Sequence, residues 1–288
     1  MSDPDPESGP QPGPAAEAAS DSAFDATVSD GVCRLHRPGT RFLSTGFDGG
    51  EVVADAAYNV TVPEGWPEQP LQPYVERRLT AAGFGDDSGA DFGGDSGDDT
   101  GTDTPPVLLT GVDQRHAHRA RHGSVEAVAT AGLSNPAQLP VAGAGAGAAD
   151  GVAGDVPTTT HCNRPGTVNV FVGTTRSLAP GALPNLVAVA AEAKATTLLA
   201  TTGFPGTTSD AVVVGCDPDG ETASFSGAAT SVGASARACV RDAITAALDS
   251  RYVDELDAAL PTSVAEAEHG VVTDETATVE PIAGDDSG

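Results

Sequence analysis

Residues 185–215 read NLVAVAAEAKATTLLATTGFPGTTSDAVVVG, and this stretch decides the fold. Its first part is built of small and apolar residues and predicts a helix from about Asn185 to Thr202. A Gly/Pro/Thr turn follows, and the β-branched run Ala211 to Val214 has the length of a buried strand. A long helix that returns through a tight turn to a buried strand indicates a sheet layered with helices.

Lys194 lies at the centre of this stretch and is the only lysine among 288 residues. A lone charge on a helix is usually solvated, so one interpretation is retention on an exposed face. The other is a functional ammonium, which can donate to a developing oxyanion or, once desolvated, act as a base. Glu192 is two residues away and lies near the opposite side of the helix, so we expect no simple ion pair between the two.

The composition excludes several classes of partner. Aspartate and glutamate number 41 against 14 lysines and arginines, which gives a net charge of −27. Such a surface repels nucleic acid and anionic membranes, so neither is an expected partner. Scarce lysine with abundant Ala, Gly, Thr and Asp is typical of a cytoplasm of high salt, where screening removes much of the self-repulsion. We therefore expect a salt-adapted (halophilic) cytoplasmic protein.

The cysteines indicate a reducing compartment. They are far apart, without a CxxC pair, and the chain shows neither a signal peptide nor a run of eighteen apolar residues. Reduced thiols are therefore expected. The four are Cys33, Cys162, Cys216 and Cys239.

The domain organisation follows from changes in composition. Residues 1–30 hold few large apolar side chains and predict a disordered acidic tail, and residues 261–288 return to the same composition. Between them we expect a single domain over residues 31–260. Two Gly- and Asp-rich insertions, 85–106 and 141–157, cannot pack and predict solvated loops.

Within the domain, strand patterns come first and long helical patterns come late, so we expect an α/β (α+β) layered sheet. Helices are predicted at 73–83, 185–202 and 234–249. Strands are predicted in VCRL and RFLST, separated by a turn HRPGT, and at 58–62, 107–112, 124–135, 165–172 and 211–214, with a strand-to-turn segment in SFSGAATSVG.

Asp210 is a candidate catalytic residue because of its position. It follows the Gly/Thr/Ser turn and immediately precedes the expected strand, where a carboxylate can project into a cleft as a base or water-orienting group. The alternative is an Asx-type hydrogen bond to its own turn. Thr207 and Thr208 of the same turn can supply hydroxyl or backbone donors to a substrate.

Polar residues of other expected strands are further candidates. Ser134 and Asn135 end the segment SVEAVATAGLSN, which suits an exposed nucleophile or oxyanion donor, with an ordinary turn as the alternative. Asn169 alternates with valines and, if buried, must bind either a substrate amide or a neighbouring turn. Paired glycines allow a close approach to a ligand, although a plain turn also explains them. The remaining candidates for substrate binding are Asn59, Gly49 and Gly50.

The basic segment RHAHRARH supports a rival hypothesis, a zinc site in a metal-assisted amidohydrolase. The segment offers no carboxylate ligand and crowds several cations together. We therefore favour a solvated basic loop that docks an anionic group, and we assign no metal. The zinc-ligand candidates are His116, His118, His122, His161 and Cys162.

Six motifs follow one another along the chain: LSTGFDGG, TAGLSN, PGTVNVFV, EAKATTLL, FPGTTSDAVVV and FSGAATSVG. Together they resemble the adenosylcobinamide amidohydrolase family of corrinoid salvage, over about residues 33–249. Members of that family cleave the amide that joins the aminopropanol arm to the corrin ring, releasing adenosylcobyric acid. The resemblance implies an enzyme that acts on a small-molecule corrinoid and has no cofactor of its own. The turn FPGTTSD departs from the Thr-Gly-Thr-Gly-Thr-Asp type of run that is usual in the family.

Amide hydrolysis requires an activated nucleophile, a donor for the developing oxyanion and an acid for the departing amine. A non-catalytic corrinoid-binding protein on the same scaffold is the alternative, because a fold alone never determines a function. The expected catalytic residues are Lys194, Asp210, Glu192 and Ser134, and the expected substrate-binding residues are Gly49, Gly50, Asn59, Asn135, Asn169, Thr207 and Thr208.

Overall fold

The computed structural model describes residues 22–63, 70–85, 104–141, 166–253, 260–267 and 269–282. The helices among them are α1 (Leu71–Ala81), α2 (Ala182–Thr202) and α3 (Ser231–Tyr252), with two 3₁₀ turns, η1 (Gln114–His116) and η2 (Val264–Glu266). The strands are β1 (Asp25–Ser29), β2 (Val32–Ser44), β3 (Gly50–Thr61), β4 (Val107–Thr110), β5 (His118–His122), β6 (Val125–Thr130), β7 (Pro136–Gln138), β8 (Asn169–Leu178), β9 (Gly206–Thr207), β10 (Ala211–Ala223) and β11 (Val271–Val272).

The main sheet contains eight of these strands and is mixed. Its order is β4-β3-β2-β10-β8-β6-β5, and β1 pairs with β2 beside this path. The pairs β8/β10 and β3/β4 are parallel, whereas the other neighbours are antiparallel. The expected layered α/β fold is confirmed.

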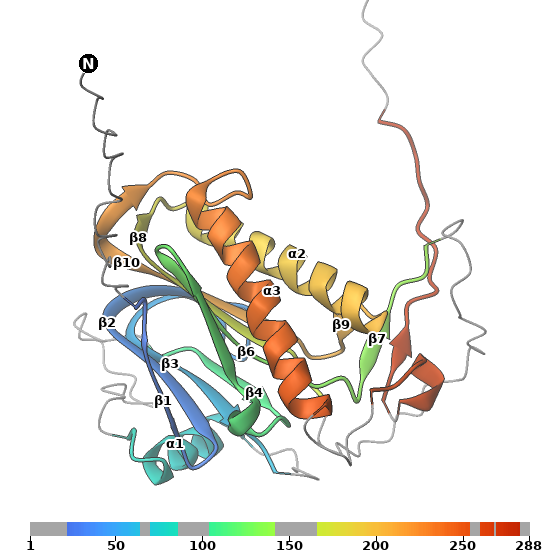
Figure 1. The fold of residues 1–288 in the computed structure, drawn as a ribbon, viewed down its shortest axis with the longest axis horizontal. Coiled ribbons are helices and arrows are strands. Elements are labelled where there is room, and N and C mark those ends of the chain that lie inside the picture. Colours follow the sequence, from blue (N-terminus) through green and yellow to red (C-terminus); the bar gives the residue numbers. More distant parts are fainter. Residues whose placement is uncertain are drawn as a thin grey trace, which may run out of the picture.

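Helices α2 and α3 lie side by side across one face of this sheet (Figure 1). Alternate residues of the central strands point to these helices, because side chains of a strand alternate between its two faces. Val170 and Val172 of β8 and Val212 and Val214 of β10 belong to the resulting apolar core. Helix α2 ends at Gly203, whose φ of 81° places it in the left-handed region that favours glycine at a helix end.

The opposite face of the sheet holds an aromatic core with the N-terminal segment. The rings of Phe24 and Phe42 stack with centroids 5.9 Å apart. A Cβ atom on Gly173 of β8 would lie 2.2 Å from the Phe24 ring, so only glycine fits beneath this side chain. Glu126, 1% exposed, accepts hydrogen bonds from the backbone N–H groups of Ala23 and Phe24 at 3.2 Å each.

A third core lies under α1. Tyr74, Val75 and Leu79 of this helix are buried against Tyr58 and Val60 of β3. This core is remote from α2 and α3, so it stabilises the outer strands of the sheet.

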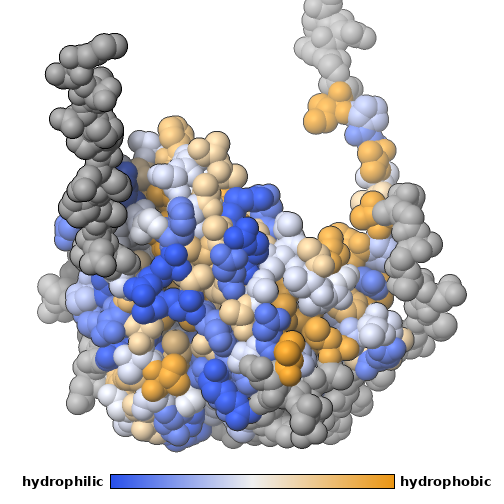
Figure 2. Space-filling model, viewed as in Figure 1, coloured by the Kyte–Doolittle hydropathy of each residue, from blue (hydrophilic) through white to orange (hydrophobic). Residues whose placement is uncertain are grey.

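A second, three-stranded sheet has the order β11-β7-β9. Ala137 of β7 pairs with Gly206 of β9 on one side and with Val271 of β11 on the other. This small sheet lies beyond the C-terminal end of α2 (Figure 1). On the same view, Figure 2 shows hydrophilic residues over much of the face that carries α3 and hydrophobic residues gathered near β7 and β11.

The structure differs from the sequence predictions at five places. The range 261–288, which the sequence assigned to a disordered tail, contains η2 and also β11, a strand of the small sheet. The segment HRPGT is not a chain reversal: β2 continues through it with a register shift between His36 and Thr40. Strand β1 (Asp25–Ser29) lies within the range that the sequence assigned to the N-terminal tail, because burial of Phe24 anchors it. The basic segment forms the edge strand β5 and the turn η1 rather than a loop, and SFSGAATSVG forms a turn that leads into α3 rather than a strand.

Several predictions concern residues outside the described ranges. Most of the N-terminal tail and of the two insertions falls there, as do residues 268 and 283–288 of the C-terminal tail, His161 and Cys162. The three described cysteines are free and buried: Cys33, Cys216 and Cys239. No helix in the described ranges is both long enough and apolar enough to cross a lipid bilayer.

Candidate active site

An ion pair between Lys194 and Asp210 lies where α2, β9 and β10 meet. Nζ of Lys194 donates to Oδ2 of Asp210, and the two side chains are only 12% and 10% exposed. Helix α2 carries the lysine over the edge of the sheet, and the turn before β10 presents the carboxylate to it. The structure thus brings together two residues that the sequence offered separately as catalytic candidates.

Asp210 is saturated with hydrogen-bond donors. Its Oδ1 accepts from the backbone N–H of Val168 at 2.9 Å and from the hydroxyl of Thr207. Its Oδ2 accepts from the backbone N–H of Thr207 at 3.0 Å and from the Lys194 ammonium. A carboxylate offers about four lone-pair sites, and four donors occupy them here. This carboxylate therefore holds Lys194, the turn and the backbone just before β8 together.

Gly206 lies directly against the ion pair. A Cβ atom at this position would be 2.5 Å from Oδ2 of Asp210 and 3.0 Å from Nζ of Lys194. The glycine thus lets the backbone of β9 approach both charged groups, which explains why the turn contains glycine at this point.

Hydroxyl and amide groups surround the turn. Nδ2 of Asn135 donates to Oγ1 of Thr208 at 2.5 Å and, more weakly, to Oγ of Ser209 at 3.4 Å. The hydroxyls of Ser209 and Thr167 share a hydrogen bond of 2.9 Å. Asn135 is 1% exposed, and among the described residues its Oδ1 has no hydrogen-bond partner. We call Asn135, Thr167, Thr208 and Ser209 the polar cluster.

Ser134 is placed next to this cluster by a backbone contact. Its Oγ accepts from the N–H of Gly166 at 2.5 Å. The preceding residue, Leu133, donates its N–H to the hydroxyl of Tyr252 at 2.8 Å, which fixes the loop to the end of α3. Ser134 is thus beside the polar cluster, whereas Lys194 is on the other side of the turn.

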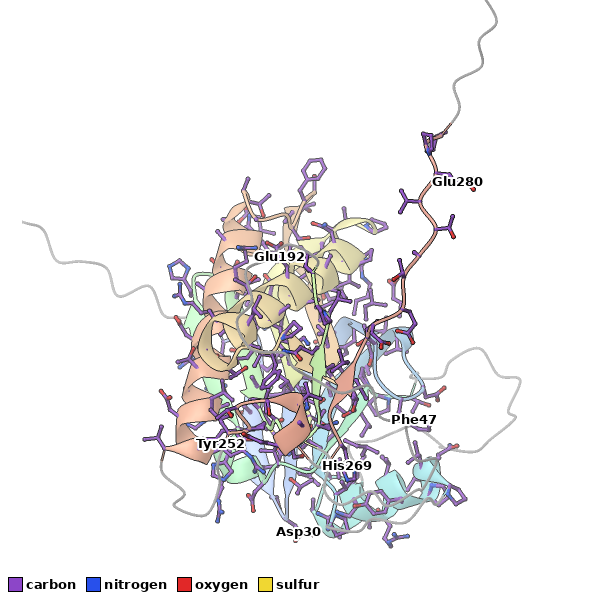
Figure 3. The ribbon with its side chains drawn as sticks, turned by 90° about the vertical axis from the view of Figure 1, so that its right-hand side faces the viewer. Asp30, Phe47, Glu192, Tyr252, His269 and Glu280 are labelled. Atoms are coloured by element: carbon purple, nitrogen blue, oxygen red, sulfur yellow. The ribbon has the colours of Figure 1, made fainter. Side chains whose placement is uncertain are left out.

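Glu192 is not part of this arrangement. It is exposed on α2 and forms an ion pair of 2.5 Å with Arg237 of α3. Figure 3 shows it at the helical layer, away from the strands. As expected from its spacing, Glu192 makes no ion pair with Lys194 in the structure.

Asn59 and Asn169 meet inside the molecule rather than at a surface. Nδ2 of Asn169 donates to Oδ1 of Asn59 at 2.9 Å and to the carbonyl of Leu109 at 3.0 Å. Asn59 in turn donates to the hydroxyl of Thr130 at 3.0 Å. The two asparagines are 2% and 1% exposed, so protein groups occupy the place that the sequence assigned to a substrate amide.

The two expected substrate-binding glycines belong to the β2–β3 connection. A Cβ atom on Gly49 would lie 2.5 Å from the carbonyl oxygen of Ser44, and Gly50 has a φ of 137°. Both observations are typical of a tight turn, which was the alternative interpretation of these two glycines in the sequence.

The described histidines of the basic segment point to separate partners. His116 shares a hydrogen bond of 2.9 Å with Ser250, and His122 shares one of 2.9 Å with Ser235, both on α3. Nδ1 of His118 contacts the carbonyl oxygen of His116 at 3.1 Å. Within the described ranges, no three His, Cys, Asp or Glu side chains are grouped so that they could hold a metal ion.

Two of the buried cysteines, Cys33 and Cys239, are poor candidates for a nucleophile at neutral pH. Burial raises the pKa of the Cys33 thiol to about 11, and burial likewise raises that of Cys239 to about 11. A thiol must ionise to attack, so both remain protonated and inert under ordinary conditions.

Sequence reasoning missed Thr167, Ser209 and the N–H of Val168. The first two are ordinary hydroxyl residues, and their contact depends on β8 and the turn before β10 lying side by side. The sequence does show several Thr and Ser residues just before Asp210. The hydrogen-bond partners of this turn, such as the N–H of Val168, come from a segment about 40 residues earlier in the chain.

Comparisons with known proteins show the family of this chain. A profile of the adenosylcobinamide amidohydrolase family matches residues 97–255. A relative from Halobacterium salinarum, named adenosylcobinamide amidohydrolase, is 54% identical over 256 residues, which are 89% of this chain and 98% of the relative. The chain belongs to the adenosylcobinamide amidohydrolase family.

Membership confirms the resemblance carried by the six motifs. The enzyme hydrolyses a C–N amide bond of its corrinoid substrate, adenosylcobinamide, in cobinamide salvage, yielding adenosylcobyric acid. A solved structure, that of the PH0078 protein from Pyrococcus horikoshii OT3, has a TM-score of 0.42 and 12% identity and covers 78% of each chain. A likeness at that TM-score is too weak to bear on the function of this chain.

Proposed function

We propose that the Lys194–Asp210 pair and the polar cluster form the active site, at which the amide between the aminopropanol arm and the corrin ring is hydrolysed. Lys194 donates hydrogen bonds to the oxyanion that develops on the amide carbonyl. The observation that carries the proposal is the ion pair itself: the only lysine of the chain is 12% exposed and is held by a carboxylate whose acceptor sites are all occupied.

The chemistry of an ammonium group explains the assignment. The group has three N–H donors, and within the described ranges its hydrogen-bond partner is Asp210. The other N–H groups can serve a substrate oxygen. A donor that is already oriented stabilises the transition state without reorganisation, which is the usual source of oxyanion catalysis. Asp210 is accordingly a positioning residue, not the general base.

The polar cluster is suited to hold the substrate amide. Asn135 and Thr208 offer an amide and a hydroxyl, the groups that pair with the N–H and C=O of another amide. The unpartnered Oδ1 of Asn135 is an acceptor that a substrate N–H can satisfy after a small movement of the turn.

The wider setting of the enzyme follows from its charge. A net charge of −27 opposes contact with nucleic acid and with anionic membranes. The partner is the small-molecule corrinoid, and the composition supports a salt-rich cytoplasm as the place of action.

The test is a comparison of Lys194→Arg and Lys194→Met with wild type. Arginine keeps the charge but replaces a compact donor with a wide planar group, and methionine keeps the length but removes the donors. We expect kcat to fall about a hundredfold or more in both, the scale of losing one oxyanion donor. The matched control is Arg237→Met, which removes the cation of the Glu192 ion pair on the exposed side of α2 and should leave kcat unchanged.

Each variant is checked for folding by its melting temperature and its circular dichroism spectrum. A folded Lys194→Met enzyme with wild-type kcat would exclude the donor role. If Lys194→Arg alone retained activity, the position would require only a positive charge.

A further inference from the structure

The small sheet exposes a continuous set of apolar side chains. Leu139 and Val141, which follow β7, are 65% and 68% exposed, and Val271 and Val272 of β11 are 39% and 38% exposed. Pro140 between the first two is exposed as well. Exposed apolar residues are ordinarily scattered, and a continuous group marks a place where something binds. We call these five residues the small-sheet patch; Figure 2 shows hydrophobic residues gathered there.

The patch is joined to the proposed active site through the backbone. Ala137 of β7 pairs with Gly206, the residue whose α-carbon lies against Lys194 and Asp210. Leu139 follows Ala137 by two residues. One spacing between strands and two steps along a strand therefore place the backbone of Leu139 about 8 Å from Gly206. Thr208 also donates its N–H to the carbonyl of Asn135, at 3.1 Å, which fixes the small sheet to the polar cluster.

The substrate has a part that matches this surface. The scissile amide hangs from the corrin ring on a short arm, so an amide held at Lys194 keeps the ring beside the site. A corrin ring presents a broad conjugated face and methyl groups, which gain free energy on leaving water. Cobalt(III) with one negative corrin and one negative adenosyl ligand leaves a single positive charge, and a surface of net charge −27 attracts it.

We propose that the small-sheet patch is the docking surface for the corrin ring and that Leu139 is its largest exposed anchor on the side of β7. The ring packs on the patch while its amide arm reaches across β9 to Lys194. This inference rests on the proposed function, because it uses the position of Lys194 to place the arm.

The experiment substitutes Leu139→Asp and, independently, Val272→Asp. Both side chains are exposed, so the fold should persist, and melting temperatures verify this. The matched control is Phe225→Asp, which changes a residue that is 75% exposed and lies between β10 and α3, outside the small sheet. The probes are adenosylcobinamide turnover and equilibrium dialysis of the product, adenosylcobyric acid, followed by its absorbance.

We expect each patch variant to raise KM and the dissociation constant of the product at least about tenfold, because burial of one apolar side chain of this size strengthens binding by about that factor. The value of kcat should stay within about threefold of wild type. Phe225→Asp should change neither quantity. Unchanged product binding in both folded patch variants would overturn the proposal. A second result would also overturn it: light scattering shows a dimer for the wild type and monomers for these variants, while each protomer keeps its affinity for the substrate. The patch would then join two copies of the chain.

The two proposals fail separately. Lys194→Met should lose kcat with little change in KM for adenosylcobinamide, because Lys194 serves the charge that develops in the transition state, whereas Leu139→Asp should raise KM and leave kcat near the wild-type value. Full turnover in Lys194→Met together with weak binding in Leu139→Asp would remove the catalytic assignment and leave the docking surface standing.

Discussion

Lys194 occupies a position where a guanidinium would not serve equally well. The other 13 of the 14 basic residues are arginines, so the chain uses arginine wherever a cation suffices. A lysine presents a compact charge with three rotatable donors, whereas arginine presents a rigid planar fork. In the space between α2 and the turn before β10, the ammonium approaches a carboxylate that three other donors hold in place. The residue type therefore matches the confined geometry.

Gly206→Ala tests how closely the backbone must approach the ion pair. The added methyl would lie 2.5 Å from Oδ2 of Asp210 and 3.0 Å from Nζ of Lys194, so the charged groups must move apart. We expect kcat to fall at least about tenfold, since small displacements of a positioned donor are costly, and unfolding free energy to fall by about 1–3 kcal/mol. Gly181→Ala is the control because its Cβ meets nothing within 4 Å. Wild-type kinetics in Gly206→Ala would show that the ion pair does not require this approach.

The elements around the site differ in how well the sequence predicts them. Helix α2, the turn and the start of β10 are local features, and the residue types of 185–215 predict all three, although β10 continues to Ala223. The contact of Asn59 with Asn169 is different, because these residues lie on strands separated by β2 and β10 in the sheet. Only the curvature of the whole sheet brings them together. Curvature depends on many residues at once, so no local pattern could predict that Asn169 donates a hydrogen bond to Asn59.

The same limit explains the N-terminal strand. Composition up to residue 30 is poor in large apolar side chains, yet a single one, Phe24, is enough to anchor β1 when a glycine lies beneath it.

Half of the polar cluster was predicted from the sequence: Asn135 and Thr208 were assigned to the site, whereas Thr167 and Ser209 were not. Their hydroxyls become informative only once β8 and β10 are known to be neighbours.

The packing of β1 on the sheet gives a prediction at this scale. Phe24→Ala should lower the unfolding free energy by about 3 kcal/mol, the usual cost of removing a buried phenylalanine. Gly173→Ala should lower it by about 1–3 kcal/mol, because the methyl would overlap the Phe24 ring. In the double variant the clash is absent, so the two losses should not add. Urea denaturation of the four proteins measures this coupling, and strictly additive losses would show that Phe24 does not occupy this place.

On the scale of the whole molecule, the acidic surface governs the conditions under which the fold holds. Forty-one acidic residues produce a net charge of −27, and their repulsion destabilises the compact state at low ionic strength. The Debye length falls from about 10 Å at 0.1 M salt to about 3 Å at 1 M, which removes repulsion between all but adjacent charges.

Stability should therefore rise with salt. Between about 0.1 M and 1 M potassium chloride we expect the melting temperature to increase by several degrees, as screening adds a few kcal/mol. Glucose at equal osmolality is the control, because it stabilises by exclusion from the surface without screening charge. An equal rise in glucose, or no rise in potassium chloride, would show that charge repulsion is not the limiting factor.

The central claim, that the reaction takes place at Lys194, is tested most directly by a crystal structure of the enzyme with adenosylcobyric acid. The carboxylate of this product is the former amide carbonyl, so it marks the position of the reacting carbon. We predict an oxygen of that carboxylate within hydrogen-bond distance of Nζ of Lys194, with the corrin ring over β7 and β11. A product carboxylate bound elsewhere, for instance in the groove between α2 and α3 beside Arg237 and Arg241, would contradict the account.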